Sequence, residues 1–338
     1  MRKMKKTRLL SVAVVLCMLL ALQGCGRKFK VEEADKIKEE NLIEVGVSQL
    51  GSESAWRTVN TTSIRNAFSK ENGYFLVFDN ARQKQENQIK AVRSYISQQV
   101  DYILLSPIVE DGWDTVLQEA KEANIPVLLI DRGVKVKDKS LYTTRVGSNF
   151  EKEGRSAGEW LEKHLREKNR EKEELQIVVL QGTKGATATI GRTKGFQKIA
   201  NAHKNWKIVE QVDADFTTAK GKEEMHKILK KHKNIDVVIA QNDDMAFGAV
   251  GEIEKAGRMP GHDAGILVIS YDGVKESLKK VQSGTINAVI ECNPDQGSMI
   301  EKVVTMLESG DTVEKNYYVP EKVFTRENVD QFIDGRKY

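Results

Sequence analysis

One loop near the N-terminus places an indole between two charged groups. The apolar run Ile43–Ser48 leads into this loop, which contains Glu53, Trp56 and Arg57. A sugar ring has an apolar C–H face that can lie on an indole, and its hydroxyls bind charged groups more strongly than neutral ones. We therefore interpret these three residues as candidate sugar ligands.

Polar side chains also follow other apolar runs. Val127–Ile130 is followed by Asp131 and Arg132, Val237–Ala240 by Asn242, Ile266–Ser270 by Asp272, and Ile286–Ile290 by Glu291. A single Asp or Asn at such a position is more often a helix N-cap. Ligands of open α/β sheets, however, bind beyond the carboxyl ends of the strands, where these side chains would converge. Each group left unpaired in a closed cleft would cost about 1–3 kcal/mol, which would make sugar binding stereospecific.

Short apolar runs alternate with amphipathic segments along the chain, a pattern typical of parallel sheets flanked by helices. We expect strands at 43–48, 75–78, 102–106, 127–130, 177–180, 207–212, 237–240, 266–270 and 286–290. We expect helices at 56–70, 83–98, 111–123, 151–168, 189–202, 220–232, 245–255, 275–282 and 296–307.

The number of strands and their polar ends favour an α/β fold of two doubly wound parallel-sheet lobes joined by a hinge. A closed eight-fold barrel is the alternative. We expect an N-terminal lobe of residues 41–146 plus about 293–320, and a C-terminal lobe of residues 147–292 plus about 321–338. The segment Arg145–Asn149 would be a crossing between them.

The first 24 residues have the layout of an export signal. Five basic residues precede Leu9–Leu22, an apolar run too short for a comfortable membrane span. The segment Leu22–Cys25 resembles the bacterial lipobox, where the chain is cut before a cysteine whose thiol is diacylated. We predict a signal peptide at 1–24, a lipidated Cys25 and a charged tether at 25–40. An uncleaved anchor with an incidental cysteine is the alternative.

The basic excess of the chain belongs to this signal. Without its five basic residues, 48 Lys and Arg stand against 49 Asp and Glu, a balance that gives no argument for nucleic-acid binding. Only Cys292 remains for the folded part, so no internal disulfide can form there, and the five histidines show no metal-ligand spacing. We expect no metal and no cofactor.

At these residues the chain resembles the sugar-binding proteins of ABC importers that have the type I periplasmic binding fold. The likeness is closest to the galactofuranose-binding branch of that family and covers almost the whole chain after the signal. It is strongest at Ser48–Arg57, Gln83–Ser94, Ile125–Arg132, Asn242–Met245 and Asp272–Gly273.

The resemblance implies two aromatic ligands. Trp56 matches the residue that stacks on the sugar ring from the first lobe, and Phe216 looks like the one that closes from the second. Each has a structural alternative, because Trp56 would also suit a helix cap against the core and Phe216 ordinary core packing. Trp113, at the start of a predicted helix, is interpreted as a packing residue.

The resemblance also implies a set of hydroxyl ligands. Those shared across the family are Asp131, Arg132, Arg192, Asn242 and Asp272. Glu53 and Arg57 are shared more narrowly, with the galactofuranose-binding branch. Glu291 lies where ribose-type members have a glutamine, with one more residue before Pro294.

The predicted function follows from this match. We expect a monomeric, lipid-anchored extracytoplasmic receptor that closes over a monosaccharide, galactofuranose or a similar aldose, and delivers it to an ABC permease and its ATPase. It would not be an enzyme. The alternatives are a sugar-sensing co-receptor for a membrane sensor kinase and a glycosidase that uses paired carboxylates such as Glu53 and Asp131. A sugar-responsive repressor would carry an N-terminal helix-turn-helix where this chain has the signal.

Overall fold

The computed structural model describes residues 42–338. The predicted signal peptide, the lipidated Cys25 and the tether up to residue 40 lie outside the described residues. No helix in the described part is both long and apolar enough to cross a bilayer.

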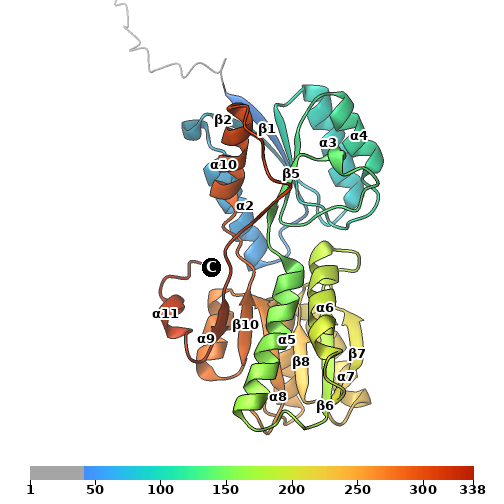
Figure 1. Cartoon of the computed structure of the whole chain (residues 1–338), viewed down its shortest axis with the longest axis vertical. Helices are drawn as coiled ribbons and strands as arrows, with labels where there is room; N and C mark the ends of the chain where they lie inside the picture. Colours follow the sequence, from blue (N-terminus) through green and yellow to red (C-terminus); the bar gives the residue numbers. More distant parts are fainter. Residues whose placement is uncertain (1–41) are drawn as a thin grey trace, which may run out of the picture. The chain divides into compact units, whose positions relative to one another are not determined.

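The first sheet has six strands that all run parallel to their neighbours (Figure 1). Its strands, in spatial order, are β11 (Asn316–Tyr318), β5 (Thr144–Gly147), β4 (Val127–Ile130), β3 (Tyr102–Leu105), β1 (Ile43–Gln49) and β2 (Tyr74–Asn80). The helices of this lobe are α2 (Ala55–Ala67), α3 (Gln85–Gln98), α4 (Asp114–Glu122) and α10 (Gly297–Glu308). Leu104 packs with side chains of α2 and α10, whereas Ile103 and Leu105 pack with those of α3 and α4. Both faces of the sheet are therefore buried at its centre, which is why the central strands β3 and β4 read as continuous apolar runs.

The second sheet is built in the same way. Its strands, in spatial order, are β12 (Val323–Thr325), β10 (Ala288–Glu291), β9 (Leu267–Asp272), β8 (Val237–Ala240), β6 (Leu175–Gln181) and β7 (Trp206–Asp213). Among these strands only β12 is antiparallel to its neighbour. The helices of this lobe are α5 (Phe150–Glu167), α6 (Thr187–Ala200), α7 (Thr218–Lys231), α8 (Asp243–Lys255), α9 (Lys275–Ser283) and α11 (Asp330–Ile333). The predicted class of two doubly wound parallel-sheet lobes is thus confirmed.

Every predicted strand and helix overlaps an observed element, and the differences lie at edges and ends. Helix α3 begins at Gln85 and not at residue 83, because Arg82 and Gln83 have left-handed φ angles of 53° and 61°. Strands β5, β11 and β12 have only three or four residues and lack an apolar run, so the sequence pattern does not reveal them. Of these three, β11 and β12 lie at the edges of their sheets. Two short 3₁₀ helices, Lys70–Asn72 and Lys139–Leu141, complete the first lobe.

The chain passes between the two sheets three times. The first crossing lies between β5 and α5, the second between β10 and α10, and the third between β11 and β12 (Figure 1). In each sheet the chain order reverses beside the first strand of the lobe, between β1 and β3 and between β6 and β8. Ligands of doubly wound sheets bind at such reversals, beyond the carboxyl ends of the strands.

Candidate functional site

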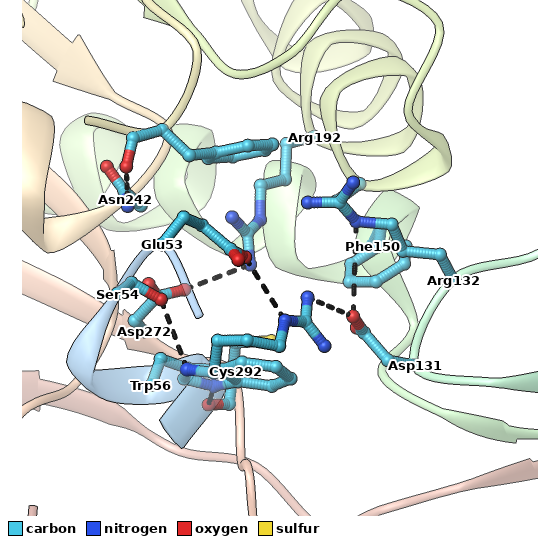
Figure 2. Close-up of a pocket in the computed structure, with 13 residues that line it drawn as sticks. Glu53, Ser54, Trp56, Asp131, Arg132, Phe150, Arg192, Asn242, Asp272 and Cys292 are labelled. Carbon is cyan, nitrogen blue, oxygen red and sulfur yellow. Dashed lines mark hydrogen bonds and ion pairs between the residues drawn. The ribbon is translucent and has the colours of Figure 1, made fainter. Parts of the chain in front are cut away.

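A small cavity lies where the carboxyl ends of strands from the two sheets meet. It is lined by Glu53, Ser54, Trp56, Arg57, Asp131, Arg132, Phe150, Ala188, Arg192, Phe216, Asn242, Asp272 and Cys292 (Figure 2). Its volume of about 30 Å³ holds a water molecule or two, far below the roughly 300–1,000 Å³ of a typical ligand pocket. The lobes are therefore closed on one another, and the polar groups of the cavity bond among themselves.

Trp56 and Arg57 enter the cavity from the first turn of α2. The Ser54 side chain caps this helix by accepting a hydrogen bond from the Arg57 backbone N–H at 3.1 Å. The Trp56 Nε1–H donates to the backbone oxygen of Cys292 at 2.5 Å, and the Arg57 guanidinium lies 4.6 Å from the centre of the indole. Trp56 also belongs to an apolar cluster of the second lobe, so it both packs and lines the cavity.

The Arg57 guanidinium joins the two carboxylates of the first lobe. It lies 3.1 Å from Glu53 Oε1 and 2.7 Å from Asp131 Oδ2, and it also donates to the Gln49 side chain. Burial alone would lower the pKa of Arg57, but the charges of Asp131 and Glu53 raise it above its ordinary value. Glu53 accepts a further hydrogen bond from Gln83 at 2.8 Å. The two residues expected from the galactofuranose-binding branch are thus ion-paired at one wall of the cavity.

Arg132 is the least compensated cation of the site. Its guanidinium donates to the Ile108 backbone oxygen at 3.0 Å and lies 5.2 Å from the centre of the Phe216 ring. Its distance to the Asp131 carboxylate is 3.9 Å. Burial, followed by repulsion from Arg57, lowers the pKa of Arg132 to about 10. A ligand that offers hydroxyl oxygens to this guanidinium would relieve part of its desolvation.

The second lobe contributes a buried arginine held by two acids. Arg192 lies on α6, 2.6 Å from Glu153 Oε2 and 3.4 Å from Asp272 Oδ1, and it also donates to the Gln241 backbone oxygen. Burial raises the pKa of Asp272 well above its ordinary value, although the charge of Arg192 opposes that rise. This lobe therefore presents a guanidinium beside a carboxyl group, as the first lobe does.

A polar residue after a strand can cap the next helix or line a ligand site, and Asn242 does both. Its side-chain oxygen caps α8 by accepting from Met245 N at 2.9 Å, while its amide donates to the Phe216 backbone oxygen at 3.1 Å. Asp243, the next residue, faces away from the cavity and accepts hydrogen bonds from Ser270, Ser277 and the backbone of residues 273 and 274. Burial raises the pKa of Asp243 to about 6.

Three of the lining residues have left-handed backbone conformations that side chains rarely adopt. Asp131, Phe216 and Asp272 have φ angles of 59°, 58° and 98°. Each such residue costs of order 1–3 kcal/mol, and residues of this kind cluster at ligand sites. All three residues line the same small cavity.

Nine of the ten predicted ligand residues line the cavity, and Glu291 does not. Its carboxylate is buried but points away from the cavity, where it lies 2.8 Å from Arg336 Nη1 and accepts from the Lys322 backbone N–H at 3.0 Å. Because side chains alternate along β10, the next residue, Cys292, points to the cavity in its place. The prediction for Glu291 is therefore corrected by one residue.

Four lining residues were not predicted as ligands: Ser54, Phe150, Ala188 and Cys292. Phe150 begins α5 directly after the first crossing, and its ring lies 5.2 Å from the Arg145 guanidinium and 5.5 Å from that of Arg192. A phenylalanine in the first turn of a helix reads as a core residue, so only the geometry identifies it. Trp113, by contrast, is fully buried among apolar residues of the first lobe.

Among residues 42–338, one group of side chains comes close enough to hold a metal ion. Glu153, Cys292 and Glu321 place their polar atoms within 4.8 Å of one another. Glu153 already pairs with Arg192, and burial raises the pKa of the Glu321 carboxyl group and of the Cys292 thiol, so these two groups favour their neutral forms. This donor set does not fit a cation. Glu53 and Asp131 share one guanidinium, which leaves neither placed as the acid of a glycosidase.

Known proteins resemble the chain over most of its length. The periplasmic binding protein domain matches residues 45–310. The galactofuranose-binding protein YtfQ of Escherichia coli K12 is 44% identical over 256 residues, which cover 75% of this chain and 78% of YtfQ.

Solved structures agree with this sequence match. The binding protein of the arabinose ABC transporter of Shewanella sp. ANA-3, bound to α- and β-L-arabinofuranose, is 42% identical with a TM-score of 0.81, covering 87% of this chain and 95% of that one. A Mycobacterium smegmatis protein in complex with β-D-fucofuranose is 40% identical with a TM-score of 0.82, covering 88% and 95%.

Proposed function

The chain belongs to the periplasmic binding protein family, and from this premise we propose that it is the lipid-anchored, extracytoplasmic sugar receptor of an ABC importer. Its relatives are sugar-binding proteins, and it is a binding protein and not an enzyme. The lipid anchor is inferred from Leu22–Cys25, and the permease and ATPase from the names of the relatives. In this role the closed form is the one that the permease recognises.

The ligand we propose is a monosaccharide in its five-membered ring form, galactofuranose or a similar aldose. The observation that carries this proposal is the wall formed by Glu53, Trp56 and Arg57 with Asp131, in which one guanidinium joins two carboxylates beside an indole. The relatives named above are described as binding galactofuranose, arabinofuranose and fucofuranose. Glu53 and Arg57 would therefore distinguish furanoses from six-membered rings.

Binding would use hinge closure, the motion typical of such two-lobed folds. The sugar enters the open cleft, its ring lies between Trp56 and Phe216, and its hydroxyls bind the charged groups that the closed cavity now pairs with one another. The ligand stabilises the closed state only by its higher affinity for that state. No bond is made or broken, so the acids and arginines act as hydrogen-bonding partners.

Calorimetry with ring-locked sugars tests the proposal. The full-length chain in detergent is titrated with 1,4-anhydrogalactitol, whose five-membered ring cannot change size, and with its six-membered isomer 1,5-anhydrogalactitol as the matched control. We expect the five-membered ring to bind at least tenfold more tightly. Equal affinity would overturn the furanose assignment, and no binding of any aldose in a wider panel would overturn the sugar-receptor function.

A further inference from the structure

A single carboxyl group connects all three crossings between the lobes. Glu321 lies on the third crossing, between β11 and β12. Its Oε1 accepts a hydrogen bond from the Ser148 hydroxyl on the first crossing and another, at 3.2 Å, from the Asn293 backbone N–H on the second. Segments that are 173 and 28 residues away in the chain thus meet at one oxygen atom.

The arrangement suits a carboxyl group that keeps its proton. Both donors use Oε1, so Oε2 is available to carry a hydrogen while the two hydrogen bonds persist. The two hydrogen bonds to Oε1 by themselves favour the ionised form, but burial, followed by repulsion from Glu153, outweighs them and raises the pKa of Glu321 to about 9. The titratable and charged groups around Glu321 are Glu153 on α5, the neutral Cys292 thiol on the second crossing and Arg192 on α6, with Arg145 of β5 bonded to the Ser148 backbone oxygen.

The same group is connected to the sugar site. The Ser148 hydroxyl lies 3.2 Å from the Cys292 thiol, and Cys292 lines the cavity. Cys292, Glu153 and Glu321 lie within 4.8 Å of one another, and Glu153 binds Arg192 at 2.6 Å. The Cys292 backbone oxygen accepts the hydrogen bond from the Trp56 indole. A continuous polar path therefore leads from the hinge to two lining side chains, one in each lobe.

We propose that Glu321 is a positioning residue of the receptor, whose protonated carboxyl group ties the three crossings together and favours the closed cleft. The inference rests on the proposed function only for the biological purpose of closure, which is sugar capture. Its evidence is the set of hinge contacts given above. Ionisation of Glu321 would place a buried negative charge beside Glu153 and Cys292, and the hinge would relieve it by opening to water.

The direction of the pKa shift of Glu321 determines how closure of the lobes depends on pH. The closed state holds the Glu321 proton more tightly than an open, hydrated carboxyl group does, because burial raises the pKa from an ordinary 4.5 to about 9. The stabilisation of the closed state is therefore complete below about pH 4.5, decreases as the pH rises, and is lost above about pH 9. Within this window the ratio of open to closed molecules rises by up to about tenfold per pH unit.

Distance measurements between the lobes test the proposal without any sugar. Spin labels are attached at Lys135→Cys and Lys194→Cys, two side chains that are each 70% exposed, in the full-length chain with Cys17→Ser and Cys25→Ser, in detergent. A chain without the two new cysteines shows that buried Cys292 takes up no label. Electron–electron resonance then gives the distribution of distances at each pH from 5 to 10.

In the otherwise unchanged chain we expect a longer distance to gain population as the pH rises. Glu321→Gln keeps the accepting oxygen but cannot ionise, so it should stay closed over the whole range. Glu321→Ala removes the acceptor and should populate the longer distance at every pH. Glu314→Gln, an exposed carboxylate near the start of β11, is the matched control and should keep the unchanged profile.

Two outcomes overturn the inference. In the first, the distances in Glu321→Gln depend on pH in the same way as those in the unchanged chain. In the second, Glu321→Ala has the same distance distribution as the unchanged chain at every pH. The glutamine variant also separates Glu321 from Glu153, Asp243 and Asp272, whose pKa values are raised as well. If the distances respond as expected while no aldose binds, the hinge inference stands and the proposed function falls.

Discussion

Removing the Asp131 carboxylate should weaken sugar binding far more than it weakens the fold. Asp131 lies 2.7 Å from Arg57, and both side chains are almost completely buried, at 4% and 3% exposure. In the proposed complex this carboxylate binds two adjacent hydroxyls, and each hydrogen bond to a charged group contributes about 1.5–3 kcal/mol. Asp131→Ala should therefore cost about 3–6 kcal/mol of binding free energy, a loss of about 150-fold to 20,000-fold in affinity.

The cost to folding should be smaller. Breaking a buried ion pair typically costs 3–5 kcal/mol, because an uncompensated charge remains. Arg57 retains Glu53 at 3.1 Å and the Gln49 side-chain oxygen at 3.3 Å after the substitution. We therefore expect the free energy of unfolding to fall by about 1–3 kcal/mol, which leaves a folded protein for the binding assay.

Calorimetry with 1,4-anhydrogalactitol and thermal unfolding measure the two effects separately. The matched control is Asp111→Ala, since Asp111 belongs to the same lobe but is 74% exposed and 3.9 Å from Lys135. The control should change affinity by less than twofold. Equal losses in the two variants, or an unchanged affinity in Asp131→Ala, would refute the placement of the sugar against this carboxylate.

Three further substitutions test other parts of the chain. A Cβ atom at Gly182 would lie 1.9 Å from Cζ of the buried Phe216 ring, so Gly182→Ala should displace the ring and weaken sugar affinity at least tenfold, as titration would detect. Asp243→Ala leaves four hydrogen-bond donors without their acceptor and should lower the free energy of unfolding by about 3–5 kcal/mol while changing the sugar affinity of the folded protein only a few-fold. Cys25→Ser should abolish the incorporation of radiolabelled fatty acid into the protein without changing sugar affinity, and incorporation that persists in this variant would contradict the lipid anchor at Cys25.

The central strands could be predicted from sequence because a strand that is buried on both faces consists almost wholly of apolar residues. Few other elements have such a short, continuous apolar run. Val127–Ile130 and Val237–Ala240 are continuous apolar runs, and both have the predicted bounds. Edge strand β11, Asn316–Tyr318, has an exposed face and one hydrogen-bonded neighbour, so its residues need not be apolar. Its place in the first sheet depends on pairing with β5, far away in the sequence, which no local pattern encodes.

The sequence could predict those residues of the site that lie at the ends of strands. Asp131, Asn242 and Asp272 could be found because each lies within two residues of the end of an apolar run. The failure at Glu291 has a simple cause, since a shift of one residue in a strand exchanges the two faces and Cys292 then points to the cavity. Phe150 could not have been found, because its position depends on where the first crossing enters α5.

The paired charges of the closed cavity explain how such a site can be both stable and selective. Arg57 and Arg192 each have carboxyl partners without any ligand, so the closed state does not carry the full cost of their burial. A sugar must therefore supply hydrogen bonds at least as good as those it displaces, and its affinity is the difference between two large terms. A stereoisomer with one misdirected hydroxyl breaks the existing pairing without replacing it, which costs about 1–3 kcal/mol for each group left unsatisfied. Selectivity thus comes from the hydrogen bonds that the protein gives up, as much as from those that the sugar gains.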